Sequence, residues 1–156
     1  MKNYLLDTNL LLYLLRKDAR WFKIEDKFSL HQTNNFVSII SMAELWSIGL
    51  RNQWGDNRLN QIETLTQDFT FIDLNIESIV KRYGEIDAFS QGKLKDRPLP
   101  IISGQVRTTA RNMGKNDLWL AATASILNLT LMTTDQDFTH LSGVFLNLVT
   151  LDMQEL

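Results

Sequence analysis

Four acidic residues in distant parts of the sequence are the strongest candidates for chemistry: Asp7, Glu44, Asp117 and Asp135. Carboxylates gathered at one place repel each other, and a close pair at 4 Å costs about 4 kcal/mol at an effective dielectric near 20. Such a cluster must take up protons or bind cations. Mg²⁺ prefers oxygen ligands, and a pair of such ions activates a water and stabilises the leaving oxygen of a phosphodiester. That chemistry requires no side-chain nucleophile.

The predicted secondary structure places these four acids at one edge of a sheet. Two of them, Asp7 and Asp135, lie just past the ends of short apolar runs, 3–6 and 129–132, which are typical of buried strands. The other two are expected in the first turn of helices at 41–53 and 117–127. In parallel sheets, ligands bind beyond the carboxyl ends of the strands, so we expect the four side chains to converge there.

The whole chain alternates predicted strands and helices. The expected strands are 3–6, 36–40, 69–74, 129–132 and 145–151, and the expected helices are 8–16, 41–53, 56–67, 76–90, 117–127 and a short one at 136–141. Thr8 or Asn9, Ser41 and Asn116 are the expected N-caps of the helices that they open. Residues 17–35 are interpreted as a polar stretch.

This alternation predicts the α/β class, with a central, mainly parallel sheet between two layers of helices. Residues 1–156 suit a single domain. The stretch 91–114 is interpreted as a loop, because two prolines and three glycines interrupt it, with a helical turn or two near 105–112.

Each of the four acids also has a purely structural interpretation. Asp7 lies in Asp-Thr-Asn and could be a turn or cap residue. Glu44 could complete a capping box, and Asp117 could stabilise a helix N-terminus. Asp135 could belong to the cap of the short helix. Convergence of all four at one edge is what favours chemistry.

The composition of the chain excludes several classes of protein. The 156 residues are 44% hydrophobic and 22% charged, and they include no cysteine, which excludes disulfides, thiolate catalysis and cysteine-ligated zinc. The net charge of −2 argues against coating of nucleic acid by bulk electrostatics. Polar residues interrupt the apolar N-terminus, and no run is long enough for a membrane span, so we expect a cytoplasmic protein.

Histidine chemistry is not indicated. His31 and His140 are isolated in the sequence, and neither can be assigned to a Ser–His pair. Surface or capping positions are the expectation for both.

Four local sequences, in order along nearly the whole chain, resemble a known set of motifs. They are Leu5-Leu6-Asp7-Thr8-Asn9, Ser41-Met42-Ala43-Glu44-Leu45, Asn116-Asp117-Leu118-Trp119-Leu120 and Thr133-Thr134-Asp135-Gln136-Asp137-Phe138. Together they resemble the PIN-domain family and, within it, the VapC toxins of bacterial and archaeal toxin–antitoxin pairs.

The resemblance implies a PIN-like fold and an endoribonuclease that uses Mg²⁺, with Mn²⁺ as a substitute. The four acids match the family's metal ligands. Asn9 and Thr134 match polar positions beside the site, and Asp137 is an extra acid, either supporting the ligands or capping a helix. The resemblance also implies an RNA substrate, an antitoxin protein that blocks the site, and a homodimer.

The segment 91–115 departs from the smallest VapC toxins because it is longer. It contains six basic residues, namely Lys93, Lys95, Arg97, Arg107, Arg111 and Lys115, against the single acid Asp96. It leads directly to Asp117, so we interpret this basic loop insertion as a source of contacts to RNA phosphates. A solvated loop and a surface for an acidic partner are the alternatives.

Three other functions remain open. A housekeeping PIN-domain nuclease of RNA processing would use the same acids. A non-catalytic PIN-like binding module would have no chemical need for mutually repelling carboxylates. An aspartyl-phosphate enzyme of the haloacid-dehalogenase type would use Asp7, but those enzymes have Asp-x-Asp where this chain has Asn9.

Overall fold

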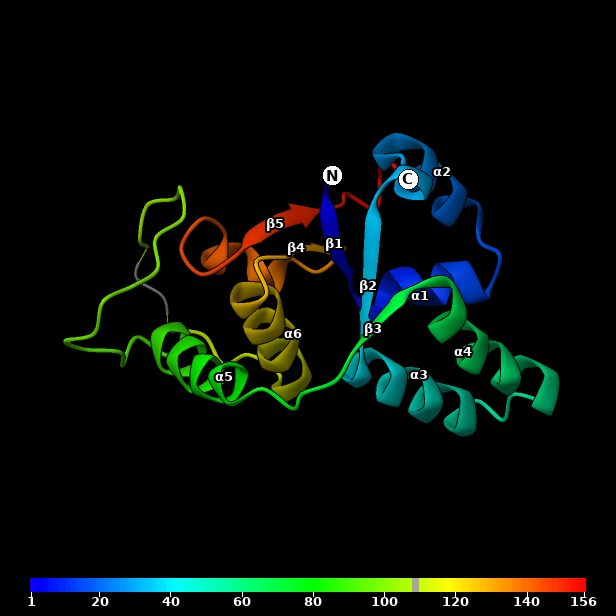
Figure 1. Ribbon diagram of the computed structural model, residues 1–156, viewed down its shortest axis with the longest axis horizontal. Coiled ribbons are helices and arrows are strands. Elements are labelled where there is room, and N and C mark those ends of the chain that lie inside the picture. The colour runs from blue at the N-terminus through cyan, green and yellow to red at the C-terminus, as the bar shows by residue number, and fades with distance from the viewer. Residues whose placement is uncertain (108–109) are drawn as a thin grey trace.

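The computed structural model in Figure 1 describes residues 1–107 and 110–156. Its centre is a five-stranded sheet in the order β3-β2-β1-β4-β5. The strands are β1 (Asn3–Leu6), β2 (Asn34–Ser38), β3 (Thr70–Ile72), β4 (Thr130–Thr133) and β5 (Asn147–Thr150). All neighbouring pairs are parallel, which confirms the predicted sheet.

Helices cover both faces of this sheet, as Figure 1 shows. They are α1 (Thr8–Leu15), α2 (Ala19–Phe28), α3 (Ile39–Arg51), α4 (Asp56–Asp68), α5 (Glu77–Ser90) and α6 (Lys115–Ile126), with short 3₁₀ helices η1 (Leu30–Gln32) and η2 (Gln136–Leu141). One buried core joins the sheet to α1–α4, and a second joins it to α5, α6 and η2. The expected three-layer α/β/α architecture is therefore confirmed. Within the described ranges, none of the helices has the length and apolar character needed to cross a membrane.

Strand register sets the position of the first acid. Leu6 of β1 pairs with Met132 of β4, and the N–H of Asp7 donates to the Met132 carbonyl at 3.0 Å. The next residues of the two strands, Asp7 and Thr133, therefore emerge side by side at the carboxyl edge.

Residues 17–35 contain a helix, α2, where we expected none. Asp18 caps it by accepting a 3.0 Å hydrogen bond from the N–H of Arg20. Trp21 and Ile24 are buried, whereas most other positions are charged or exposed. Five of the ten residues of α2 are apolar, but charged residues are interspersed among them, so the segment was interpreted as a polar stretch.

Three helices begin at caps other than the expected ones. Asp7 itself caps α1, and Ser38 caps α3 by accepting from the N–H of Ile40 at 3.1 Å. Because α3 starts at Ile39, Ser41 lies inside the helix and the predicted capping box is wrong. Gly114 is the N-cap of α6, so Asn116 does not cap that helix.

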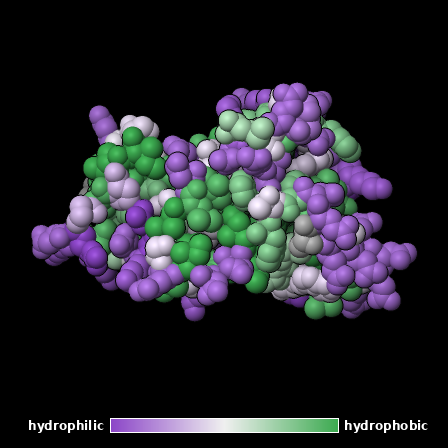
Figure 2. Space-filling view, in the orientation of Figure 1, coloured by the Kyte–Doolittle hydropathy of each residue, from purple (hydrophilic) through white to green (hydrophobic). Residues whose placement is uncertain are grey.

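The basic segment is a loop that projects beyond α5, away from the sheet (Figure 1). Residues 105–107 and 110–112 are not helical, and residues 108 and 109 of the expected helical turn lie outside the described chain. Three exposed apolar side chains, Ile101, Ile102 and Val106, belong to this loop. Figure 2 shows hydrophobic residues at the upper left of the molecule and hydrophilic ones at its far left tip. The loop surface is therefore apolar as well as basic.

Candidate active site

Asp7 is held at the end of β1 by two hydrogen bonds. Its Oδ1 accepts from the N–H of Thr8 at 2.6 Å, and its Oδ2 accepts from the Thr133 hydroxyl at 2.6 Å. The residue is only 6% exposed. The interpretation of Asp7 as a cap is confirmed, because it is the N-cap of α1. The hydrogen bond from Thr133 of β4 is not needed for capping, and it fixes the second carboxylate oxygen.

Glu44 lies in the second turn of α3, one turn later than expected, because that helix begins earlier. Its Oε1 accepts a 2.7 Å hydrogen bond from the Asn116 amide, and its Oε2 accepts from the Thr8 hydroxyl. Glu44 thus connects α1, α3 and α6. Asn116, expected as a cap, instead orients this carboxylate.

The other two acids lie at the same edge. Asp117 is in the first turn of α6, as expected, and a Cβ atom added to Gly114 would be 3.0 Å from its Oδ2. Asp135 follows β4, its N–H donates to the Thr133 hydroxyl at 2.9 Å, and its Oδ1 accepts from the N–H of Asp137 at 2.8 Å. The Thr133 hydroxyl therefore contacts two of the acids.

Electrostatics show that the four acids share one environment. Burial raises the pKa of Asp7 to about 6, and the charges of Glu44 and Asp135 add to that increase, while hydrogen bonds from Thr133 and Thr8 oppose it. Burial also raises the pKa of Asp117 to about 6, helped by the other three acids and by Asp137. The chain therefore keeps mutually repelling carboxylates together at a free-energy cost.

The donor set suits a hard cation. In the described ranges, no three carboxylate or imidazole groups are close enough to hold a metal ion by themselves. Mg²⁺ usually binds through one or two carboxylates and keeps several waters, so a looser cluster of oxygen ligands matches its chemistry. The four acids are the residues that could hold such an ion.

The predicted supporting residues flank the cluster. The Asn9 amide donates to the Thr134 hydroxyl at 3.4 Å, which joins the start of α1 to the end of β4. The carbonyl of Asp137 accepts from Nη1 of Arg111 at 3.1 Å, and its Oδ1 lies 3.5 Å from the same atom. Asp137 thus contacts the basic loop.

Three residues that orient the acids were not assigned to the site from the sequence: Thr8, Thr133 and Asn116. Each directly neighbours a residue of the motifs that was assigned. Thr133 could have been identified from its position as the last residue of β4, the strand beside β1, because a hydroxyl there can reach Asp7.

The structure divides the six basic residues of the loop. Lys93, Lys95 and Arg97 lie in the part that follows α5 and leads into the projection. Arg107 is exposed in the loop, between these three residues and the last two. Arg111 reaches Asp137, and Lys115 is the first residue of α6. Among the described contacts, Arg111 and Lys115 are the basic residues of the loop that are connected to the elements that carry the acids.

Comparison with known proteins agrees with this fold. The PIN domain family matches residues 4–144, and the chain therefore belongs to the PIN-domain family. Ribonuclease VapC1 of Haemophilus influenzae (strain R2866) is 27% identical over 130 residues, which are 83% of this chain and 84% of that protein.

Two solved structures share the fold across almost the full chain. VapBC-1 from nontypeable Haemophilus influenzae has a TM-score of 0.71 and 26% identity, covering 94% of this chain and 96% of that one. VapBC2 from Rickettsia felis, bound to a DNA fragment of its promoter, has a TM-score of 0.72 and 21% identity, covering 96% and 98%. The second likeness concerns the fold alone.

Proposed function

We propose that this protein is a metal-dependent endoribonuclease that hydrolyses RNA phosphodiester bonds, and that it is the toxin of a type II toxin–antitoxin system. The observation that carries the proposal is the cluster of four acids, in which Asp7 and Asp117 both have a pKa raised to about 6. Residues with strongly perturbed pKa values gather at functional sites. The likeness to a VapC ribonuclease supports RNA as the substrate.

Mg²⁺ is the cofactor that we propose, with Mn²⁺ as a substitute. When bound, it would supply a water activated for attack and would neutralise charge on the phosphodiester. Asp7, Glu44, Asp117 and Asp135 would be its ligands, directly or through water.

The chain's own contribution is to hold these oxygens in place before substrate arrives. Thr133 and the N–H of Thr8 fix both oxygens of Asp7. Asn116 and the Thr8 hydroxyl fix both oxygens of Glu44. Groups that orient ligands in this way are worth about 10–100-fold in metal affinity or activity.

The partner that we propose is an antitoxin protein that blocks the acid cluster. Several similar solved structures are toxin–antitoxin complexes, including VapBC-1 from nontypeable Haemophilus influenzae. A housekeeping nuclease would have the same site but no such partner. Homodimer formation stays a prediction from the resemblance, and a cytoplasmic location stays a prediction from the sequence.

RNA cleavage by the purified protein tests the proposal. We expect cleavage with Mg²⁺ and with Mn²⁺, none with EDTA, and a loss of at least about 100-fold in Asp7→Asn and in Asp117→Asn. Asp56→Asn, which removes an exposed carboxylate from the first turn of α4, is the matched control and should stay active. Cleavage without metal, or full activity in the two site variants, would show that the cluster is structural.

A further inference from the structure

A polar cavity of about 580 Å³ lies where the basic loop meets η2. Arg107 and Arg111 of the loop line it, together with Thr139 and His140 of η2 and Ser142 beyond it. No carboxylate is among the described residues that line this cavity. It is thus a positively charged hollow in a chain whose net charge is −2.

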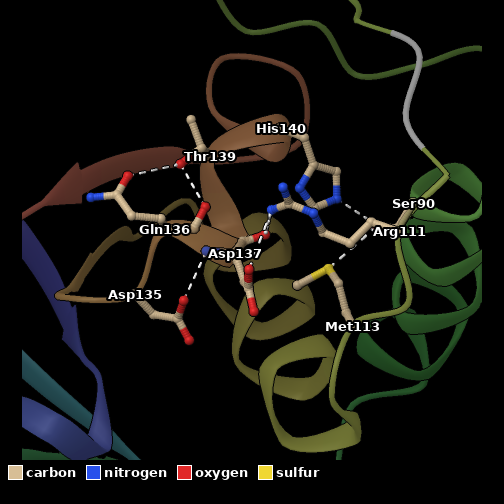
Figure 3. A network of polar contacts seen from close by, with 8 residues as sticks. All are labelled: Ser90, Arg111, Met113, Asp135, Gln136, Asp137, Thr139 and His140. Atoms are coloured by element: carbon tan, nitrogen blue, oxygen red, sulfur yellow. Dashed lines mark hydrogen bonds and ion pairs between the residues drawn. The ribbon is translucent and has the colours of Figure 1, made fainter.

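The cavity adjoins the acid cluster through η2. Nη1 of Arg111 donates to the carbonyl of Asp137 at 3.1 Å, and the N–H of Asp137 donates to Oδ1 of Asp135 at 2.8 Å. Figure 3 shows this chain of contacts from the arginine to the acid. In the described chain, all of the contacts of the Arg111 guanidinium are made by Nη1, and Nε and Nη2 make no hydrogen bond. The guanidinium therefore retains donors for a ligand.

The back of the cavity is formed by His140, which is held by two contacts. Nε2 of His140 lies 2.7 Å from the Ser90 hydroxyl (Figure 3). The His140 ring also stacks on Phe89, with 4° between the ring planes. The expectation that His140 has a simple surface or capping position is therefore wrong, although it does lie in the last turn of η2. Ser90 is fully buried, so this Ser–His pair is not an exposed nucleophile. Burial and the charge of Arg111 lower the pKa of His140.

The loop that supplies the arginines is anchored on both sides of the cavity. The N–H groups of Ile102, Ser103 and Gly104 all donate to the Gly143 carbonyl, at 2.7, 2.9 and 2.9 Å. The N–H of Arg111 donates to the Ser90 carbonyl at 2.7 Å. Arg111 therefore starts from backbone that is bonded to α5, and Arg107 follows, three residues on, the backbone that is bonded to the turn after η2.

We propose that this cavity binds a backbone phosphate of single-stranded RNA, at a nucleotide flanking the one that is cleaved at the acid cluster. This subsite rests on the proposed ribonuclease function. Guanidinium groups bind phosphate through paired donors, and a phosphate contact here would set the register of the strand across the acids. Arg107 and Arg111 are the contacting cations, whereas Lys93 and Lys95 make no contribution to this subsite.

The arrangement of charge favours RNA over an acidic protein segment as the occupant. The chain has no Lys or Arg after Lys115, so η2 and the strand ends beside the acids carry no cation of their own. A phosphodiester strand that reaches the repelling acids needs positive charge close by, and the two arginines are placed to supply it. An acidic partner would have no comparable need to lie next to the acid cluster.

Binding of a fluorescein-labelled single-stranded RNA of mixed sequence, measured by anisotropy across a salt series with Mg²⁺ present, tests the subsite. The measurement uses Asp7→Asn protein so that the RNA stays intact. We expect Arg107→Gln and Arg111→Gln each to weaken binding several-fold and to reduce the slope of log K against log salt concentration by about 0.7 per lost phosphate contact. The double variant Lys93→Gln/Lys95→Gln is the control, because it removes two charges from the same loop outside the cavity. It should weaken binding less than either arginine variant, because it leaves both cations of the cavity in place.

The possible outcomes distinguish a failure of the proposed phosphate subsite from a failure of the proposed ribonuclease function. Equal weakening in the arginine variants and in the lysine control would overturn the subsite, because the loop would then act only through its total charge. Unchanged RNA binding in the arginine variants would also overturn it and would point to an acidic protein partner, while cleavage by the wild type would leave the function intact. A wild type that neither binds nor cleaves RNA would overturn both. Thermal unfolding of each variant verifies that it is folded.

Discussion

Thr133 donates a 2.6 Å hydrogen bond to Asp7 across 126 positions of the chain. The bond exists because β4 is paired with β1 in a register that ends both strands together. The same hydroxyl accepts from the N–H of Asp135, so one buried side chain fixes the geometry of two acids. The cluster is thus organised by a residue that carries no charge.

Replacing Thr133 with Val should impair catalysis more than it impairs folding. The shape is kept, but Asp7 loses a hydrogen bond that lowers its pKa, so its pKa should rise further above its ordinary range. We expect activity at neutral pH to fall about 10–100-fold and the acidic limb of the pH–rate profile to move to higher pH. The free energy of unfolding should fall by about 1–3 kcal/mol.

Thr130→Val, at the other end of β4, is the control for this experiment. It makes the same chemical change in the same strand, away from the carboxyl edge. If the two variants had the same pH–rate profile, Thr133 would not position Asp7.

Asn116→Ala should lower activity without destabilising α6. The N-cap of that helix is Gly114, whereas the Asn116 amide is bonded to Glu44, so removal should release Glu44 and leave the helix intact. We expect a loss of about tenfold or more in activity and little change in the midpoint of thermal unfolding. Asn60→Ala, an exposed substitution on α4, should change neither. A lower unfolding midpoint with unchanged activity would show that Asn116 caps α6 and does not orient Glu44.

The strands and most of the helices could be predicted because each depends on a local pattern. The apolar runs before Asp7 and Asp135 could end only at one edge of a parallel sheet, and that edge carries the acids. Helix α2 was missed because only Trp21 and Ile24 of its ten residues are fully buried. Tertiary packing, rather than a long amphipathic repeat, stabilises it.

The side-chain contacts of the site could not be predicted in the same way. Whether Asn116 caps its own helix or reaches Glu44 depends on where α3 lies relative to α6. The cap of α3 depends on where β2 ends, and that point lies at Ser38 rather than at Ser41. Such contacts join segments far apart in the chain, so no local pattern encodes them.

Stability of the metal-free protein should decrease as the pH rises from about 4 to about 6. Burial raises the pKa of Asp7 and of Asp117 to about 6, from an ordinary value of 3.8. In that window the native state binds more protons than the unfolded state, so the free energy of unfolding falls as the pH increases. For Asp7 the difference corresponds to at most about 3 kcal/mol, and the half-buried Asp117 contributes less.

Calorimetry with EDTA at a series of pH values measures this effect. Asp7→Asn should flatten the decrease, because the amide has no charge to lose or gain. Adding Mg²⁺ at neutral pH should raise the unfolding midpoint of the wild type more than that of the variant, since binding to the native state stabilises it. Parallel curves for the two proteins would mean that Asp7 is not the group responsible.

Gly104→Ala should displace the basic loop and weaken RNA binding. A Cβ atom at Gly104 would lie 2.8 Å from the backbone oxygen of Ser142 and 3.1 Å from Gly143, and backbone atoms cannot move aside as a flexible side chain can. The loop would have to lift from η2, which would separate Arg107 from the cavity. We expect weaker binding and a smaller salt dependence, close to those of Arg107→Gln, with cleavage reduced and the acids unchanged.

Gly84→Ala is the matched control for this substitution. A Cβ atom at Gly84 meets nothing within 4 Å, and the residue lies inside α5, where Ala is favoured over Gly by about 0.5–1 kcal/mol. That variant should be slightly more stable and should bind RNA like the wild type. If Gly104→Ala also bound RNA with the wild-type salt dependence, the position of the loop against η2 would not matter to the nucleic acid, and the cavity would have to serve another ligand.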